Sequence, residues 1–114
     1  MTVEGSSPAG SVPSVSIVVP VHNEAENIPV LADEIAAALK GRRFEAIFVN
    51  DGSSDETEKV LRQLGKTRPW LRQIKHARSC GQSAAVRSGV RAARAPLVAT
   101  LDGDGQNDPA FIPK

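Results

Sequence analysis

The residues whose chemistry is easiest to interpret are two aspartates separated by one glycine, Asp102-Gly103-Asp104. In an extended segment, residues i and i+2 point to the same side, so both carboxylates face one spot. Paired carboxylates repel each other unless a cation compensates them, and their oxygens suit Mg²⁺ or Mn²⁺. Gln106 adds an amide oxygen two residues later. The segment therefore predicts a divalent-metal site, although a polar turn that caps a helix explains an isolated Asp-x-Asp equally well.

A second polar segment is Asn50-Asp51-Gly52-Ser53-Ser54-Asp55. Asp51 follows a predicted strand, where its carboxylate can accept hydrogen bonds from a nucleobase N–H or a ribose hydroxyl. The helix predicted after it has an N-terminus that favours anionic groups. Taken alone, an Asp-Gly turn followed by a helix N-cap is the preferred interpretation.

Arg78 precedes Gly81 and a predicted helix of small residues, so its guanidinium can reach a diphosphate or remain a solvated surface group. We interpret Cys80 as a small packing residue rather than a catalytic thiol, because only His22 and His76 are available as imidazole bases. We expect His76 to be a polar residue at a strand end rather than a metal ligand.

Several other chemistries are excluded by spacing. A calcium loop that starts at Asp102 would need a glycine where Asn107 stands and a glutamate where Pro113 stands. A phosphatase of the haloacid dehalogenase type would need its Asp-x-Asp after the first strand. The phosphate-loop, dinucleotide-fingerprint and zinc-protease motifs are absent from the sequence.

Alternating strands and helices must position these residues. The β-branched run 15–21 and the shorter run 46–49 predict strands buried on both faces. A third strand is predicted at 71–76, more polar and so nearer a sheet edge, and a fourth at 96–101. Helices are predicted between them from apolar residues at three- and four-residue steps, within 28–39, 55–64 and 82–93. In the last helix, Gly89 predicts close approach to the sheet.

This alternation predicts an α/β fold with a doubly wound, mainly parallel sheet that stops after about four strands. Ligands of such sheets bind beyond the carboxyl ends of the strands. The polar clusters Asn23-Glu24, 51–55 and 102–108 all follow strands. We therefore expect them to converge at one edge.

Composition limits the function classes. The 114 residues include 14 Lys+Arg and 13 Asp+Glu, a net charge of +1, which argues against a nucleic-acid partner. A single cysteine excludes an internal disulfide framework and a cysteine-rich zinc cage. No apolar run approaches the ~20 residues of a membrane helix, and residues 1–14 lack a secretory signal pattern. We expect a cytoplasmic domain with a flexible leader at 1–14. The basic pairs of the domain, Arg42-Arg43 and Arg91/Arg94, are interpreted as solvated faces that can also touch an anionic membrane.

Three linked segments together resemble the N-terminal half of a family 2 glycosyltransferase with the GT-A fold. They are residues 16–24 (SIVVPVHNE), 49–55 (VNDGSSD) and 101–106 (LDGDGQ). The continuation Asn107-Asp108-Pro109 is most similar to the dolichyl-phosphate mannose synthase-like branch, whose members move a sugar from a nucleotide donor to a polyprenyl phosphate. Arg78-Ser79-Cys80-Gly81-Gln82 departs from the family's usual Arg-Asn-x-Gly at Ser79.

The resemblance implies an inverting, metal-dependent transferase at the cytoplasmic face of a membrane, with a UDP- or GDP-linked sugar as donor and a polyprenyl (dolichyl or undecaprenyl) phosphate as acceptor. It implies Mg²⁺ or Mn²⁺ held by Asp104 and Gln106, and catalytic roles for Asp102 and Asp104. The residues it implies for nucleotide-sugar binding are Pro20, Val21, Asn23, Glu24, Asp51, Ser53, Arg78, Gln82 and Asp102.

The resemblance covers residues 15–113, so we expect 15–114 to be the N-terminal, nucleotide-sugar-binding part of a larger domain. Two alternatives remain at this point. The chain can be a truncated, non-catalytic module that binds a nucleotide or assists assembly. It can also be a nucleotidyltransferase of related architecture, although it lacks the glycine- and lysine-containing loop expected after the first strand.

Overall fold

The structure is a computed structural model that describes residues 12–101. Along this range, strands and helices alternate as the sequence predicts. The elements are β1 (Val15–Val21), α1 (Ile28–Ala38), β2 (Phe44–Asp51), α2 (Thr57–Gly65), β3 (Leu71–His76), α3 (Gln82–Ala92) and β4 (Leu97–Thr100).

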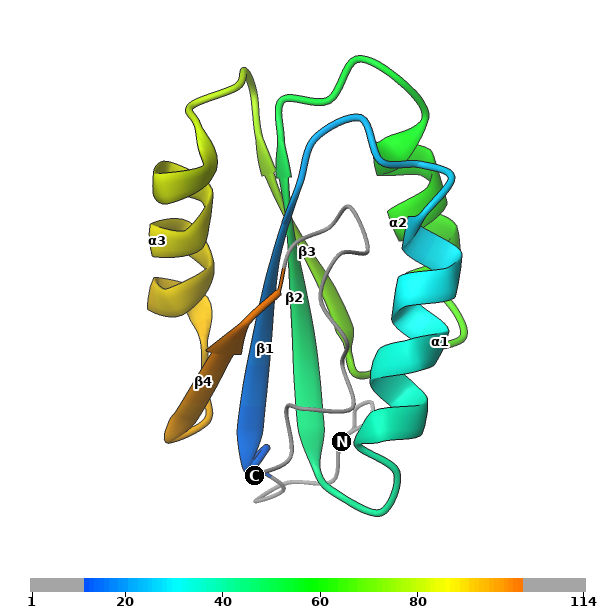
Figure 1. Cartoon of the computed structure of the whole chain (residues 1–114), viewed down its shortest axis with the longest axis vertical. Helices are drawn as coiled ribbons and strands as arrows, with labels where there is room; N and C mark the ends of the chain where they lie inside the picture. The colour runs from blue at the N-terminus through cyan, green and yellow to red at the C-terminus, as the bar shows by residue number, and fades with distance from the viewer. Residues whose placement is uncertain (1–11, 102–114) are drawn as a thin grey trace.

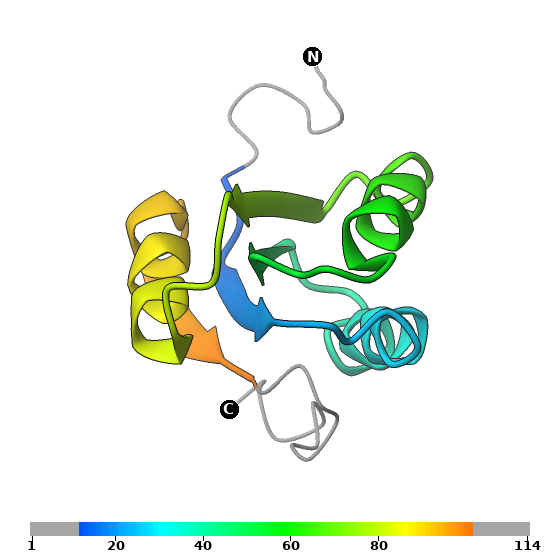
Figure 2. The same cartoon turned by 90° about the horizontal axis from the view of Figure 1, so that it is seen from above.

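The strands form one parallel sheet in the order β3-β2-β1-β4. The more polar strand β3 lies at an edge of this four-stranded sheet, as its composition predicts. Helices α1 and α2 cover one face and α3 covers the other (Figures 1 and 2). The predicted doubly wound α/β architecture is therefore confirmed for the described range.

Burial on both faces explains why β1 is apolar at every position except Ser16. Val15, Ile17, Val19 and Val21 join the larger core cluster, which includes the buried side of α1. Val18 points to the opposite face and packs in a smaller cluster under α3. These buried apolar residues meet one helical layer or the other, so the alternation of a half-exposed strand is absent.

Gly89 is the point at which α3 approaches the sheet. A Cβ built on Gly89 would lie 2.3 Å from Val18 Cγ1 and 3.1 Å from Val49 Cγ2. Both neighbours are buried, stiff, β-branched side chains. The close approach predicted for this glycine is confirmed.

The start of α2 differs from the sequence expectation. The helix begins at Thr57 rather than Asp55. Asp55 accepts a hydrogen bond from the Thr57 amide at 2.9 Å, while Glu58 pairs with Lys75 at 3.1 Å. Asp55 and Glu58 have the three-residue spacing that predicts a capping box, but this prediction is wrong, because Glu58 reaches across to β3 instead of back to the turn.

Glu45 is a buried carboxylate at the amino ends of the strands, far from the polar clusters discussed above. It is 1% exposed and accepts hydrogen bonds from Ser16 Oγ at 2.6 Å and Arg72 Nη1 at 2.8 Å. The Arg94 amide and Nε add contacts at 2.8 and 3.0 Å. Burial raises the pKa of Glu45, but these hydrogen bonds outweigh burial, and the net effect lowers it.

This network joins three strands to the α3–β4 connection. Arg94, interpreted from the sequence as part of a solvated face, does have a largely exposed side chain, but its guanidinium also pairs with Glu45 Oε1 at 3.0 Å. Within residues 12–101, no helix is long and apolar enough to cross a membrane.

Candidate functional site at the carboxyl ends of the strands

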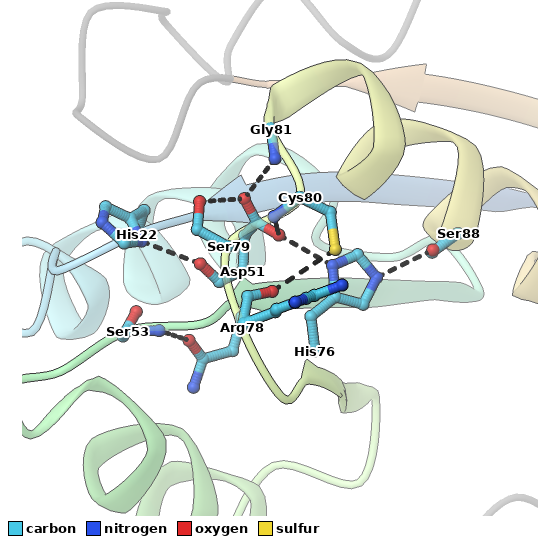
Figure 3. A network of polar contacts seen from close by, with 10 residues as sticks. His22, Asp51, Ser53, His76, Arg78, Ser79, Cys80, Gly81 and Ser88 are labelled. Carbon is cyan, nitrogen blue, oxygen red and sulfur yellow. Dashed lines mark hydrogen bonds and ion pairs between the residues drawn. The ribbon is translucent and has the colours of Figure 1, made fainter.

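The loops that follow β1, β2 and β3 meet at the carboxyl edge of the sheet. Asp51 is the last residue of β2 and His76 the last residue of β3, and the two are paired in register. The loop 77–81 then crosses above Asp51 to the start of α3 (Figure 3). This is the edge at which the sequence predicts a ligand site.

The carboxylate of Asp51 holds the 79–81 segment. Its Oδ1 accepts hydrogen bonds from the Cys80 amide at 2.8 Å and from His76 Nδ1 at 2.7 Å. Its Oδ2 accepts from the Gly81 amide at 2.9 Å and from Ser79 Oγ at 3.0 Å. Because a carboxylate offers about four acceptor sites, this side chain is fully engaged.

These hydrogen bonds determine the charge of Asp51. The residue is 5% exposed, and burial alone raises the pKa of a carboxyl group. The donors from Cys80, His76, Gly81 and Ser79 outweigh burial and lower the pKa of Asp51 from 3.8 to about 2. Asp51 is therefore an anion at neutral pH.

Gly52 allows the loop to lie this close to β2. Its φ is +66°, and a Cβ built there would lie 2.2 Å from the Ser79 amide nitrogen and 2.4 Å from the Arg78 carbonyl carbon. No other residue type fits both the backbone angle and the space. The Asp-Gly pair thus positions a carboxylate and permits a second loop to lie on it.

Asn23 joins the loop after β1 to the loop after β2. It has a positive φ of 54°, which asparagine tolerates better than most residues. Its side-chain Oδ1 accepts hydrogen bonds from the backbone amides of Ser54 at 2.8 Å and Asp55 at 3.2 Å. Its own backbone amide donates to Ser53 Oγ at 2.9 Å. Asn23 and Ser53 are therefore brought together, as the sequence predicts, but by binding each other's loops.

His22 and His76 have different environments. His22 Nδ1 lies 2.8 Å from the backbone carbonyl oxygen of Asp51, so Nδ1 carries a proton and donates. His76 Nδ1 faces the Asp51 carboxylate, and its Nε2 lies 2.9 Å from Ser88 Oγ on α3. Sequence reasoning placed His76 at a strand end but missed this link between β2, β3 and α3.

Cys80 lies on the surface of the loop. Its thiol is exposed, and Sγ lies 3.4 Å from the Arg78 carbonyl oxygen. The prediction that Cys80 is a packing residue is therefore wrong. The loop presents its backbone amides to Asp51, which turns the side chain toward solvent.

The remaining predicted site residues lie around this edge or outside the described range. Pro20 and Val21 end β1, Glu24 follows in the next loop, Arg78 is exposed, and Gln82 begins α3. The three residues expected to form the metal site and the catalytic centre, Asp102, Asp104 and Gln106, lie outside residues 12–101.

This arrangement has a clear chemical consequence. The anionic Asp51 carboxylate and the Asn23 amide fix three loops relative to one another before any ligand arrives. A ligand N–H or O–H that reaches Asp51 must replace one of the four donors already present. The exposed side chain of Arg78 lies at the same carboxyl edge of the sheet, in the loop whose amides bond to Asp51.

Comparison with known proteins gives a consistent set of matches. The family model described as "Glycosyl transferase family 2" matches residues 16–114. A dodecaprenyl-phosphate galacturonate synthase from Rhizobium johnstonii is 42% identical over 102 residues, which cover 87% of this chain and 30% of the synthase. An undecaprenyl-phosphate 4-deoxy-4-formamido-L-arabinose transferase from Pseudomonas savastanoi is 39% identical, covering 88% of this chain and 31% of that protein.

The solved structures agree. The mannosyltransferase PcManGT from Pyrobaculum calidifontis, in complex with GDP-Man and Mn²⁺, superposes with a TM-score of 0.73 at 27% identity. The match covers 82% of this chain and 28% of PcManGT. The chain thus spans about a third of the length of the proteins it matches.

Proposed function

The chain belongs to glycosyl transferase family 2 and has the GT-A type of α/β sheet, and from this premise we propose that its carboxyl edge binds the nucleoside diphosphate of a sugar donor. The observation that carries the proposal is the convergence of three loops on Asp51 and Asn23, at the end of the sheet where α/β folds bind ligands. PcManGT, a similar structure, was solved with GDP-Man and Mn²⁺.

Polar groups at this edge match the parts of such a donor. The Asp51 carboxylate accepts N–H or O–H groups, which a nucleobase and a ribose both offer. Arg78 is exposed next to the loop that Asp51 holds, and a guanidinium pairs well with phosphate oxygens. We therefore assign the base and ribose to the side of Asp51 and the diphosphate to the side of Arg78.

The metal is proposed at Asp104 and Gln106, with Asp102 beside the ribose and the sugar diphosphate. The donor set fits Mg²⁺ or Mn²⁺, because carboxylate and amide oxygens are hard ligands. When bound, such an ion stabilises the negative charge that develops on the leaving nucleoside diphosphate. The residues of this chain orient the donor, which aligns the sugar carbon for attack.

We propose a polyprenyl phosphate as the acceptor of the full-length protein to which this chain corresponds in part. Both curated relatives described above are named for reactions on a polyprenyl phosphate. A phosphate monoester is largely ionised near neutral pH because its second pKa is about 6. Such a nucleophile needs alignment rather than a strong general base. Because a polyprenyl phosphate lies in a membrane, we place the reaction at the cytoplasmic face of that membrane.

Calorimetry tests the donor proposal directly. The 114-residue chain is titrated with UDP and with GDP, in Mn²⁺ and in excess chelator, after circular dichroism has shown that it is folded. We expect one of the two nucleotides to bind with Mn²⁺ and to bind more weakly without it. Arg78→Gln should weaken binding, whereas Arg42→Gln, at the opposite end of the sheet, should leave it unchanged. A folded chain that binds neither nucleotide in Mn²⁺ contradicts the proposal.

A further inference from the structure

Asp51, His76 and Cys80 bring three different metal-ligating atoms to one place. One carboxylate oxygen, one imidazole nitrogen and the thiol sulfur all lie within 4.8 Å of one another. Figure 3 shows the Cys80 sulfur next to the ring nitrogen of His76 that faces Asp51. This is an oxygen, nitrogen and sulfur donor set, unlike the oxygen-only set expected at Asp104 and Gln106.

We propose that Asp51, His76 and Cys80 bind a thiophilic divalent ion of the zinc class, at a site distinct from the Mg²⁺ or Mn²⁺ of the transfer reaction. Tetrahedral Zn²⁺ takes Cys, His and carboxylate ligands at about 2.0–2.3 Å, so its ligand atoms lie about 3.3–3.8 Å apart. To reach this spacing, His76 Nδ1 and Asp51 Oδ1 must separate from 2.7 Å, and the sulfur starts within 4.8 Å of both. The fourth position is left to water.

The hydrogen bonds around His76 favour this role. Nδ1 lies 2.7 Å from Asp51 Oδ1, so the ion takes the place of the proton between them. Ser88 Oγ lies 2.9 Å from Nε2 and can accept a hydrogen bond from the Nε2–H once the metal occupies Nδ1. Metal-bound histidines almost always carry such a partner on the second nitrogen, which fixes the ring.

The other two ligands are also suitably placed. The Asp51 carboxylate is oriented by its hydrogen bonds from the Cys80 and Gly81 amides, which hold it on the side of the loop that faces His76. The Cys80 thiol is exposed, which gives the ion a path from solvent.

Cobalt spectroscopy of the 114-residue chain tests the proposal. A thiolate bound to Co²⁺ gives a near-ultraviolet charge-transfer band that oxygen ligands do not give, so ions at aspartates elsewhere are not mistaken for this site. We expect a band that saturates at one Co²⁺ per chain, that stoichiometric Zn²⁺ abolishes, and that a large excess of Mg²⁺ leaves unchanged.

Variants assign the ligands. Cys80→Ser should abolish the band without unfolding the chain, because its side chain is exposed. His76→Gln should weaken Co²⁺ binding by about tenfold or more, and Ser88→Ala by about tenfold. His22→Gln is the matched control and should retain full binding, because His22 bonds to the backbone carbonyl of Asp51 and to the Asn23 side chain and is not one of the three ligands. Absence of the band in the wild type, or an equal band in His76→Gln, overturns the proposal.

Discussion

Replacement of Asp51 by asparagine keeps the size and shape of the side chain but removes its charge. Four donors approach the two carboxylate oxygens, two on each. Asparagine offers one acceptor oxygen and one amide group that only donates. Whichever way the amide is turned, its N–H₂ faces a backbone N–H of the loop, from Cys80 or Gly81. The 79–81 segment therefore loses at least one of its anchors.

The pKa of Asp51 sets the size of the effect. A pKa of about 2 in the folded chain against an ordinary value of 3.8 corresponds to about 2.4 kcal/mol at about 1.36 kcal/mol per pH unit. The folded pKa is the lower one, so this stabilisation is fully present above about pH 5. As the pH falls it decreases to about half at pH 3 and nearly disappears at pH 2.

Urea unfolding followed by tryptophan fluorescence measures this difference. Trp70 is the only tryptophan, and its ring packs on Phe44 at a centroid distance of 4.9 Å, so its emission reports the folded state. We expect Asp51→Asn to lower the free energy of unfolding by about 2 kcal/mol at pH 7. The gap between wild type and variant should narrow to about 1 kcal/mol at pH 3.

A surface aspartate provides the control. Asp33 is 70% exposed and pairs with Arg68 at 3.2 Å, so Asp33→Asn should cost less than about 1 kcal/mol. Glu45 also titrates in the acid range, but it is present in both proteins and cancels in the difference. A gap between wild type and Asp51→Asn that stays constant from pH 7 to pH 3 would refute the charge-based account.

Three further predictions follow from the packing and the polar networks. Gly89→Ala should destabilise the chain by about 1–3 kcal/mol in urea unfolding, because its new Cβ meets Val18. The double variant Val18→Ala/Gly89→Ala should lose less than the sum of the two single losses, and a loss equal to that sum would contradict the clash. Glu45→Gln should lower the free energy of unfolding by about 1–3 kcal/mol, because a donor that now bonds to a carboxylate oxygen, such as the Arg94 amide, would then face an amide N–H₂. An unchanged urea midpoint would show that the network contributes nothing. If both proposals hold, Zn²⁺ should weaken nucleotide binding to the wild type in calorimetry but not to Cys80→Ser, and equal weakening in both would place the competing zinc elsewhere.

The sheet could be predicted from the sequence because its signals are local. The run 15–21 and the segment 71–76 match the bounds of β1 and β3. A parallel sheet covered on both faces produces continuous apolar runs, which are easy to recognise without tertiary information. The close packing at Gly89 could be predicted in the same way, because a glycine inside a helix is costly unless the helix packs closely against a neighbouring element.

The hydrogen-bonded networks could not be predicted in the same way. The donors to Asp51 come from residues 76–81, which are 25 to 30 positions away in the sequence, and no periodicity encodes such a contact. Glu45 did leave a signal, since a charged residue inside a buried strand requires partners. Its partners Arg72 and Arg94 lie on other elements, so only the fold identifies them.

Ser79 is the donor to Asp51 that a ligand can replace at the lowest cost. The amides of Cys80 and Gly81 are fixed by the backbone, so moving either one away from the carboxylate means rebuilding the loop. The Ser79 hydroxyl is different, because it rotates about one bond and its residue is exposed to water. A ligand N–H that takes its place on Oδ2 exchanges one hydrogen bond for another, and the loop stays closed. Under the proposed donor site, the position at which this sequence departs from the family's usual asparagine is therefore the one at which a nucleotide would replace a loop donor on Asp51.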